Sequence, residues 1–170
     1  HPHRSSDGAV AVVQNGIIEN HRALREQLEA SGVVFQSETD TEVIPHLLAA
    51  ELQQLQAAGG TPGGELLLAA LQQVVPKLQG AYALAVIWDQ APGALVVARK
   101  AAPLLIGLGE GEFLCASDTP ALAASPARSC RWKTGRWPCS HLWGWSSMTQ
   151  QGPVSNACPP SSVLWTMWRT

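Results

Sequence analysis

Two strand-like runs separated by a short turn constrain the fold of this chain most. Residues 80–88 and 94–99 are apolar and partly β-branched, and residues 89–93 between them contain Asp, Pro and Gly. Strands joined by so short a connection pair as an antiparallel hairpin. Residues 104–108 and 112–116 repeat the pattern around Gly-Glu-Gly. The sequence therefore predicts two successive hairpins.

Helical periodicity predicts helices beside these strands. In residues 20–30, Leu24 and Leu28 lie four positions apart among charged residues, which is typical of an amphipathic helix, and Ser-Gly follows as a stop signal. A second helix is expected to run to about residue 57 and a third over residues 65–75. A short helix is expected after residue 118.

The segment before the first helix predicts a strand, a tight turn and a possible catalytic feature. Residues 9–13 form a β-branched run, and Asn15-Gly16 is a strong turn dipeptide. The Asn15 amide and the Gly16 N–H would then arrive together at a strand end, where two donors can stabilise an oxyanion. An ordinary turn explains the dipeptide equally well. Residues 33–35 are expected to form another short strand.

Asp40 is the second candidate site residue. Thr39 and Glu42 have the spacing of a capping box in front of the helix that runs to residue 57. Capping accounts for Thr39 and Glu42 and leaves Asp40 without a structural task. A carboxylate at a helix start can receive a ligand's ammonium group, although it can also serve as a cap.

Composition limits the cell compartment and excludes several site classes. The 170 residues are 46% hydrophobic, with no apolar run of membrane-spanning length and no signal peptide, so a cytoplasmic protein without a membrane partner is expected. The four cysteines have neither metal-ligand nor disulfide spacing, and we expect no metal and no cofactor. Because the chain begins at His1, we expect a fragment of something longer.

Charge divides the chain into two unlike parts. All 13 acidic residues and 6 of the 11 basic ones precede residue 128, whereas the remainder has 5 basic residues and 6 of the 7 tryptophans. Nucleic-acid arms cluster their Lys and Arg, but these five are scattered, so no nucleic-acid partner is expected.

Several separate motifs follow one another along the chain. They are Asn15-Gly16-Ile17-Ile18-Glu19-Asn20-His21, Leu24-Arg25, Ser37-Glu38-Thr39-Asp40-Thr41-Glu42-Val43-Ile44, Leu78-Gln79-Gly80-Ala81-Tyr82-Ala83, Pro103-Leu104-Leu105-Ile106-Gly107-Leu108-Gly109 and Ala116-Ser117-Asp118. In this order they resemble the glutaminase domain of glutamine–fructose-6-phosphate aminotransferases, over about residues 1–125. Asparagine synthetases and amidophosphoribosyltransferases share this architecture, but asparagine synthetases carry Asn-Gly-Glu-Ile-Tyr-Asn at the turn.

The resemblance implies a fold and a set of roles. The fold is α+β, a four-layer α/β/β/α N-terminal-nucleophile hydrolase sandwich, here incomplete at its N-terminal side. Asn15 and Gly16 would form the oxyanion hole, and Asp40, Gly16 and His1 would bind L-glutamine. His1 could equally be a frayed end. The family's nucleophile is a leading cysteine whose α-amine acts as the base. No residue here fills that role, so we expect the fragment to be inactive.

The resemblance also implies partners and leaves alternatives open. A full-length parent would bind fructose 6-phosphate through a second half and is expected to be a homo-oligomer. One alternative is a noncatalytic module that binds glutamine or a partner. Another is a nonfunctional product of a shifted reading frame. A more distant one is another class II amidotransferase, such as asparagine synthetase.

The codons that the residues require predict a reading-frame shift that begins near residues 124–128. Trp and Met have one codon each, so the alternative frame is partly determined, and in it residues 130–149 can be reread as an acidic sequence that resembles the family's continuation. We therefore expect residues 1–125 to be a partial glutaminase domain and residues 126–170 to be a frame-shifted tail without defined fold.

Overall fold

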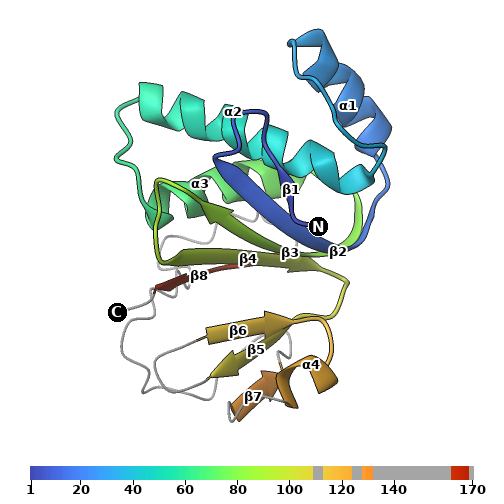
Figure 1. Ribbon diagram of the computed structural model, residues 1–170, viewed down its shortest axis with the longest axis vertical. Coiled ribbons are helices and arrows are strands. Elements are labelled where there is room, and N and C mark those ends of the chain that lie inside the picture. Colours follow the sequence, from blue (N-terminus) through green and yellow to red (C-terminus); the bar gives the residue numbers. More distant parts are fainter. Residues whose placement is uncertain (109–112, 124–127, 132–161, 169–170) are drawn as a thin grey trace, which may run out of the picture.

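A central antiparallel sheet carries the candidate site. The computed structural model describes residues 1–108, 113–123, 128–131 and 162–168. The sheet order is β1-β2-β3-β4-β8, as Figure 1 shows. The bounds are His3–Arg4 for β1, Val10–Ile18 for β2, Gly80–Trp88 for β3, Ala94–Lys100 for β4 and Ser162–Trp168 for β8. The first predicted hairpin, β3–β4, is confirmed.

Alternation of side chains explains why these residues form two-sided strands. Val12 on β2 and Leu84 and Val86 on β3 are fully buried on one face, whereas Val13 and Ile87, at the alternate positions, are about half exposed. Successive side chains of a strand point to opposite faces, so the buried set lies together on one side of the sheet. That side carries the main hydrophobic core.

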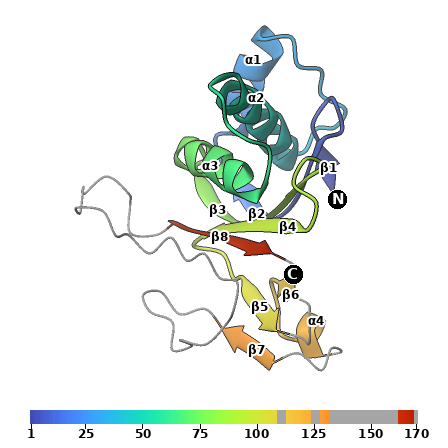
Figure 2. The same ribbon diagram turned by 90° about the vertical axis from the view of Figure 1, so that its left-hand side faces the viewer.

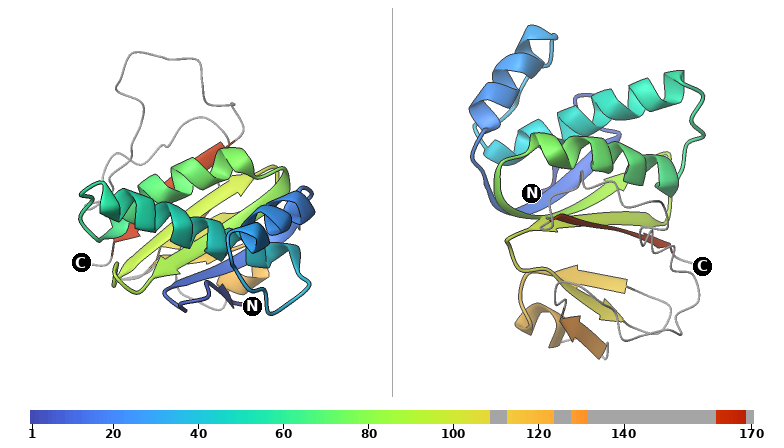
Figure 3. Two further views of the ribbon diagram at one scale, coloured as in Figure 1. Left: turned by 90° about the horizontal axis from the view of Figure 1, so that it is seen from above. Right: turned by 180° about the vertical axis from the view of Figure 1, so that it is seen from behind.

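Helices cover this face. They are α1 (His21–Ala30), α2 (Val43–Ala57) and α3 (Gly64–Val74), with short 3-10 turns η1 (Asp40–Glu42) and η2 (Val75–Lys77). In Figure 2 the three helices lie on one side of the central sheet, and Figure 3 shows α2 and α3 side by side across its strands. Leu48 of α2 and Leu71 of α3 are fully buried in the core. The three longer predicted helices are confirmed, with ends shifted by a few residues.

A second sheet faces the opposite side of the central one. Its order is β6-β5-β7, with β5 at Leu105–Leu108, β6 at Phe113–Ala116 and β7 at Arg128–Arg131. The pairing of β5 with β6 confirms the second hairpin. A smaller core lies between the sheets and joins Ala83 and Val97 to Ile106. The short helix α4, Pro120–Ala123, follows β6 (Figure 1). Stacked sheets with helices on an outer face match the predicted α+β sandwich.

Two local predictions were wrong. Asn15-Gly16 is not a turn, because β2 continues to Ile18 and pairs with β3 through Asn15↔Ala83 and Gly16↔Tyr82. Residues 33–35 are not a strand. Phe35 packs edge-to-face on His46 instead, with ring centroids 4.9 Å apart. In both places contacts distant in sequence override a local preference.

The predicted capping box of Thr39 and Glu42 was also wrong. Neither Thr39 nor Glu42 makes a side-chain cap hydrogen bond at the start of η1 or α2. The Glu42 carboxylate accepts hydrogen bonds from the N–H groups of Gln36 and Ser37, each at 2.7 Å. It therefore stabilises the preceding loop.

Two segments of the expected tail are strands. β7 pairs with β5, and β8 pairs with β4 along its whole length. The edge of a sheet offers unpaired backbone groups, which an extended segment can satisfy whatever its side chains are. Residues 109–112, 124–127, 132–161 and 169–170 lie outside the described part. The frame shift and the division near residue 125 stay predictions.

Within the described ranges, no helix combines the length and the apolar character needed to cross a membrane.

Candidate functional site

The site lies where η1 meets the end of β2. The Asp40 carboxylate accepts a hydrogen bond of 2.7 Å from the backbone N–H of Ile18, two residues after Gly16. A hydrogen bond to an ionised acceptor is stronger than one between neutral groups. The structure therefore brings Asp40 to the same strand end as Asn15 and Gly16.

This strand end has an open edge. Glu19 donates its N–H to Gln79 in the segment leading to β3, at 2.9 Å, and the Ile18 N–H points the other way, to Asp40. On that other side, β1 pairs only with Ala11 and Val12 of β2. Among the described residues, no further strand covers the edge from there to Ile18. Backbone donors on such an edge are available to a ligand.

Gly16 has a structural reason to be glycine. Its φ is +126°, and an added Cβ would lie 2.1 Å from the carbonyl oxygen of Ala81. Gly80 shows the reciprocal relation, since a Cβ there would lie 2.2 Å from the carbonyl oxygen of Ile17. Close approach of β2 and β3 therefore requires glycine on both strands, apart from any role in catalysis.

Asn15 presents its side chain to solvent. The residue is exposed, and its amide forms no hydrogen bond within the described residues. Gln14, its neighbour, is buried and accepts a hydrogen bond of 2.6 Å from the Thr41 hydroxyl. That bond is a second link between β2 and η1, next to the one made by Asp40. The Asn15 amide is therefore available beside a strand end whose position is fixed by two links.

The amino-terminal histidines lie close to η1. An Nε2 to Oγ1 distance of 3.3 Å separates His3 from Thr39, the residue before Asp40. His1 is exposed and packs edge-to-face on His3, with ring centroids 5.1 Å apart. His1, the predicted pocket-edge residue, thus packs on His3, which in turn lies beside Thr39. The family resemblance implies a pocket-edge position for the His-Pro-His at residues 1–3, and the choice between His1 and His3 was left open.

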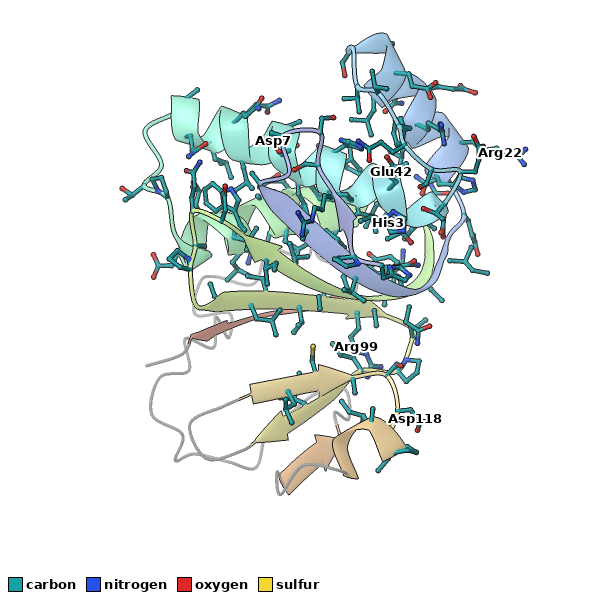
Figure 4. All side chains as sticks on the ribbon, in the orientation of Figure 1. His3, Asp7, Arg22, Glu42, Arg99 and Asp118 are labelled. Atoms are coloured by element: carbon teal, nitrogen blue, oxygen red, sulfur yellow. The ribbon has the colours of Figure 1, made fainter. Side chains whose placement is uncertain are left out.

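Glu42 is a buried charge that sequence reasoning treated as a cap. In Figure 4 it lies near the start of α2, whereas Arg22 projects outward from α1. Burial acts to raise the pKa of Glu42, but hydrogen bonds from Gln36 and Ser37 outweigh burial and lower it below its usual value. The group is therefore held as a carboxylate.

His46 lies one turn after Glu42 on α2. Its Nε2 is 3.6 Å from Glu42 Oε1, and its Nδ1 is 3.4 Å from the Ser6 hydroxyl. Burial lowers the pKa of His46, against the opposing influence of Glu42 and Asp7. His46 is therefore a buried group that resists protonation.

Cys115 does not belong to this site. It lies on β6 in the second sheet and packs against the core between the sheets. Burial raises the pKa of its thiol, so it is not activated as a nucleophile. The described part of the chain also holds no cluster of three or more His, Cys, Asp or Glu side chains suited to a metal ion.

The geometry suits a ligand that carries both an ammonium group and a carbonyl. The Asp40 carboxylate is fixed on the Ile18 N–H at the end of the open edge of β2. Gly16 and the amide side chain of Asn15 lie two and three residues before Ile18 on the same strand. Carboxylates pair with cations, and N–H donors stabilise a carbonyl oxygen that becomes negative. An amino acid with an amide side chain has both groups.

Comparison with known proteins identifies the class. A family profile described as "Glutamine amidotransferase domain" matches residues 1–124. A solved structure titled glutamine phosphoribosylpyrophosphate amidotransferase from B. subtilis, complexed with ADP and GMP, superposes with a TM-score of 0.59 at 28% identity. That match covers 75% of this chain and 26% of the other. The chain belongs to the glutamine amidotransferase domain family, with an N-terminal-nucleophile hydrolase type of fold.

Curated relatives show which kind of glutamine amidotransferase the chain resembles. The glutamine–fructose-6-phosphate aminotransferase (isomerizing) of Thermosynechococcus vestitus is 58% identical over 122 residues, and that of a Nostoc species is 55% identical over 124. These matches cover 72% and 73% of this chain. The chain spans only 18% and 19% of the two relatives' lengths. The resemblance found in the motifs is thereby confirmed, and the relatives' names describe isomerizing aminotransferases.

Proposed function

We propose that these residues are part of a glutaminase domain that releases ammonia from L-glutamine, for the conversion of fructose 6-phosphate into glucosamine 6-phosphate. The observation that carries the proposal is the Asp40 carboxylate, fixed on the Ile18 N–H beside Asn15-Gly16 at an open strand edge. Family membership makes L-glutamine the ligand of choice.

Each site residue has a role in this proposal. Asp40 pairs with the α-ammonium group of glutamine. The Asn15 amide and the Gly16 N–H stabilise the oxyanion that forms when the side-chain amide is attacked. Gly16 also allows the substrate to approach the backbone closely, and His1 borders the pocket. The work of these residues is binding and charge stabilisation, and it requires no metal or cofactor.

The nucleophile must come from outside the described arrangement. The reaction needs a thiol whose proton passes to a nearby base while the sulfur attacks the amide carbon. The base returns the proton to the nitrogen, so that the carbon–nitrogen bond breaks, ammonia leaves and a thioester remains. Water then hydrolyses the thioester to give glutamate and the free thiol. Cys115 is in the other sheet, with a raised thiol pKa. We therefore propose that the 170-residue polypeptide alone does not turn over glutamine. Fructose 6-phosphate binding and homo-oligomer formation belong, in this proposal, to a longer cytoplasmic protein.

Binding of L-glutamine is the first test. Amide resonances of the ¹⁵N-labelled chain would be followed during titration with L-glutamine, with D-glutamine as the stereochemical control. We expect shifts at Ile18, Gly16 and Asp40, and their loss in Asp40→Asn. Glu38→Gln is the matched control, because the Glu38 side chain is fully exposed. L-glutamine shifts that survive Asp40→Asn would contradict the proposed role of this carboxylate.

Turnover is the second test. Residues 1–124 would be joined to the preceding segment of the Thermosynechococcus relative, including its leading cysteine, and ammonia release would be measured. We expect glutaminase activity that falls by roughly a hundredfold in Asn15→Ala, the usual loss for one oxyanion donor. Glutamine binding in the chain without any turnover in this fusion would favour the alternative of a noncatalytic binding module.

The tail carries a separate proposal, the shifted reading frame. Its support is the change in composition after residue 128, where no acidic residue occurs and six tryptophans do. The family profile also ends at residue 124. Sequencing the DNA across the codons for residues 124–128 tests this proposal. An intact frame, with the expressed protein at the mass of the printed sequence, would refute it.

A further inference from the structure

Glu42 is a buried charged side chain whose two carboxylate oxygens both accept hydrogen bonds. Its residue is 4% exposed. One carboxylate oxygen accepts the Gln36 N–H at 2.7 Å, and the other accepts the Ser37 N–H at 2.7 Å together with the Ser37 hydroxyl. A buried carboxylate is tolerated only when such donors replace water. The sequence places this charge two residues after Asp40.

We propose that Glu42 is a positioning residue for the glutamine site: its carboxylate fixes the loop of residues 36–39 and so holds Asp40 against the Ile18 N–H. This inference rests on the proposed function for its effect on glutamine binding. Its structural half, the control of the contact between Asp40 and Ile18, can be tested without any ligand.

The contacts of Ser37 show how the loop is held. Its N–H and hydroxyl donate to Glu42, and its carbonyl oxygen accepts a hydrogen bond of 2.8 Å from Arg25 Nη1 on α1. The Arg25 guanidinium also lies over the Phe35 ring, 4.5 Å from the centroid. The loop is therefore fixed between α1 and α2 immediately before η1 begins.

Only a short segment of chain separates Ser37, which is hydrogen-bonded to Glu42, from Asp40. Asp40 follows Ser37 by three residues, and Thr39 lies between them with an extended backbone at φ −77° and ψ 145°. After Asp40, Thr41 is tied to Gln14 of β2 at 2.6 Å. Asp40 is thus held from both sides, by the Glu42 anchor before it and by the Thr41 contact after it. Loss of the first anchor leaves the Asp40 carboxylate free to turn away from β2.

Glu42 does not act on the substrate itself. Both of its oxygens are occupied by the loop, and the side chain is buried between η1, α2 and the loop. The open edge of β2 is served by Asp40. Replacement of Glu42 should therefore weaken glutamine binding through a change in Asp40, with little direct effect on the chemical step.

The experiment compares Glu42→Gln with the exposed control Glu38→Gln in the ¹⁵N-labelled chain. A glutamine has one oxygen acceptor and places an NH₂ donor against one of the loop donors. In Glu42→Gln we expect the Ile18 amide proton to move upfield and to exchange with solvent about tenfold faster, because its hydrogen bond to the charged Asp40 carboxylate is weakened or lost. The amide of Val86 on β3 should keep its exchange rate, and Glu38→Gln should change neither amide.

Ser37→Ala is the milder second variant. It removes the hydroxyl contacts to Glu42 and to Thr39 and keeps the hydrogen bond from the Ser37 N–H to Glu42. It should therefore shift the Ile18 amide in the same direction by a smaller amount. Should Glu42→Gln fail to fold, this variant decides the question. An Ile18 amide that is unchanged in the folded variants would overturn the inference.

Titration with L-glutamine separates this inference from the proposed function. We expect the dissociation constant to rise about tenfold in Glu42→Gln. If the unmutated chain does not bind L-glutamine while the Ile18 amide still responds to Glu42→Gln, the proposed function fails and the positioning role stands. If the chain binds L-glutamine and neither the affinity nor the Ile18 amide responds, the positioning role is refuted and the proposed function stands.

Discussion

Replacement of Gly16 by alanine should destabilise the fold through two effects. The first is conformational, because φ +126° is in a region that only glycine adopts readily, at a cost of about 1–3 kcal/mol for another residue. The second is steric, because the new Cβ would lie 2.1 Å from the Ala81 carbonyl oxygen. That oxygen belongs to the backbone of β3, which cannot move aside without loss of ladder pairing. Such overpacking costs about 1–3 kcal/mol.

Gly32→Ala is the matched control. Gly32 has φ +93°, and a Cβ there would meet nothing within 4 Å. It therefore measures the conformational effect almost alone. Gly16→Ala should exceed it by the steric contribution, about 1–3 kcal/mol. Gly80→Ala should resemble Gly16→Ala, because its Cβ would lie 2.2 Å from the Ile17 carbonyl oxygen.

Urea unfolding followed by far-UV circular dichroism provides the assay. With an m-value of about 2 kcal/mol/M, the midpoint of Gly16→Ala should lie about 0.5–1.5 M below that of Gly32→Ala. This loss would be a large part of a typical folding stability of about 5–15 kcal/mol. Equal midpoints for the two variants would show that β2 and β3 do not approach as closely as described, and that Gly16 is needed for function alone.

Four further outcomes are expected. The free energy of unfolding should fall as the pH drops below about 6.5, because the unfolded chain then protonates His46, whereas burial lowers the pKa of His46 in the fold. The slope of this free energy against pH is at most about 1.4 kcal/mol per pH unit for one proton, and His46→Gln should make it smaller. At lower pH, protonation of Glu42, whose pKa is also lowered in the fold, should add a second decrease, seen in acid titrations of the same variant. Thr41→Val should cost about 1–3 kcal/mol in urea unfolding, because it leaves the buried side-chain oxygen of Gln14 unpaired. Thr41→Val combined with Gln14→Leu should recover part of this loss, since it also removes the Gln14 amide nitrogen, which has no partner among the described residues. A double variant less stable than the single one would contradict the argument. The purified 170-residue polypeptide should release no ammonia from glutamine, because the two cysteines among the described residues, Cys115 and Cys130, lie on β6 and β7 of the second sheet. A coupled glutamate dehydrogenase assay would reveal any turnover.

The sequence by itself determined the elements whose periodicity is strong. Apolar, partly β-branched runs separated by turn residues predicted β3, β4 and the turn between them, and the spacing of Leu24 and Leu28 predicted α1. These patterns are sufficient because burial of one face is the main source of stability for such elements. The motifs also identified the family, since separate segments that match in order are a specific signal. Asp40 could be selected because capping left it without a task.

Tertiary structure decided what happens where local preferences are weak. Asn15-Gly16 favours a turn, but pairing with β3 extends β2 to Ile18, and the positive φ of Gly16 serves the close approach of two strands. Turn preferences amount to fractions of a kcal/mol, whereas a full ladder of backbone hydrogen bonds and a buried strand face contribute several times more.

The role of Glu42 depended on tertiary structure in the same way. Its spacing from Thr39 satisfies a capping rule, yet its carboxylate is bonded to the loop of residues 36 and 37. Which donors a buried charge will meet depends on how α1, α2 and the loop pack together, and sequence spacing contains no information on that packing. The residues proposed for the site could therefore be chosen from the sequence, whereas the contacts that hold Asp40 in place depend on the packing of segments distant along the chain.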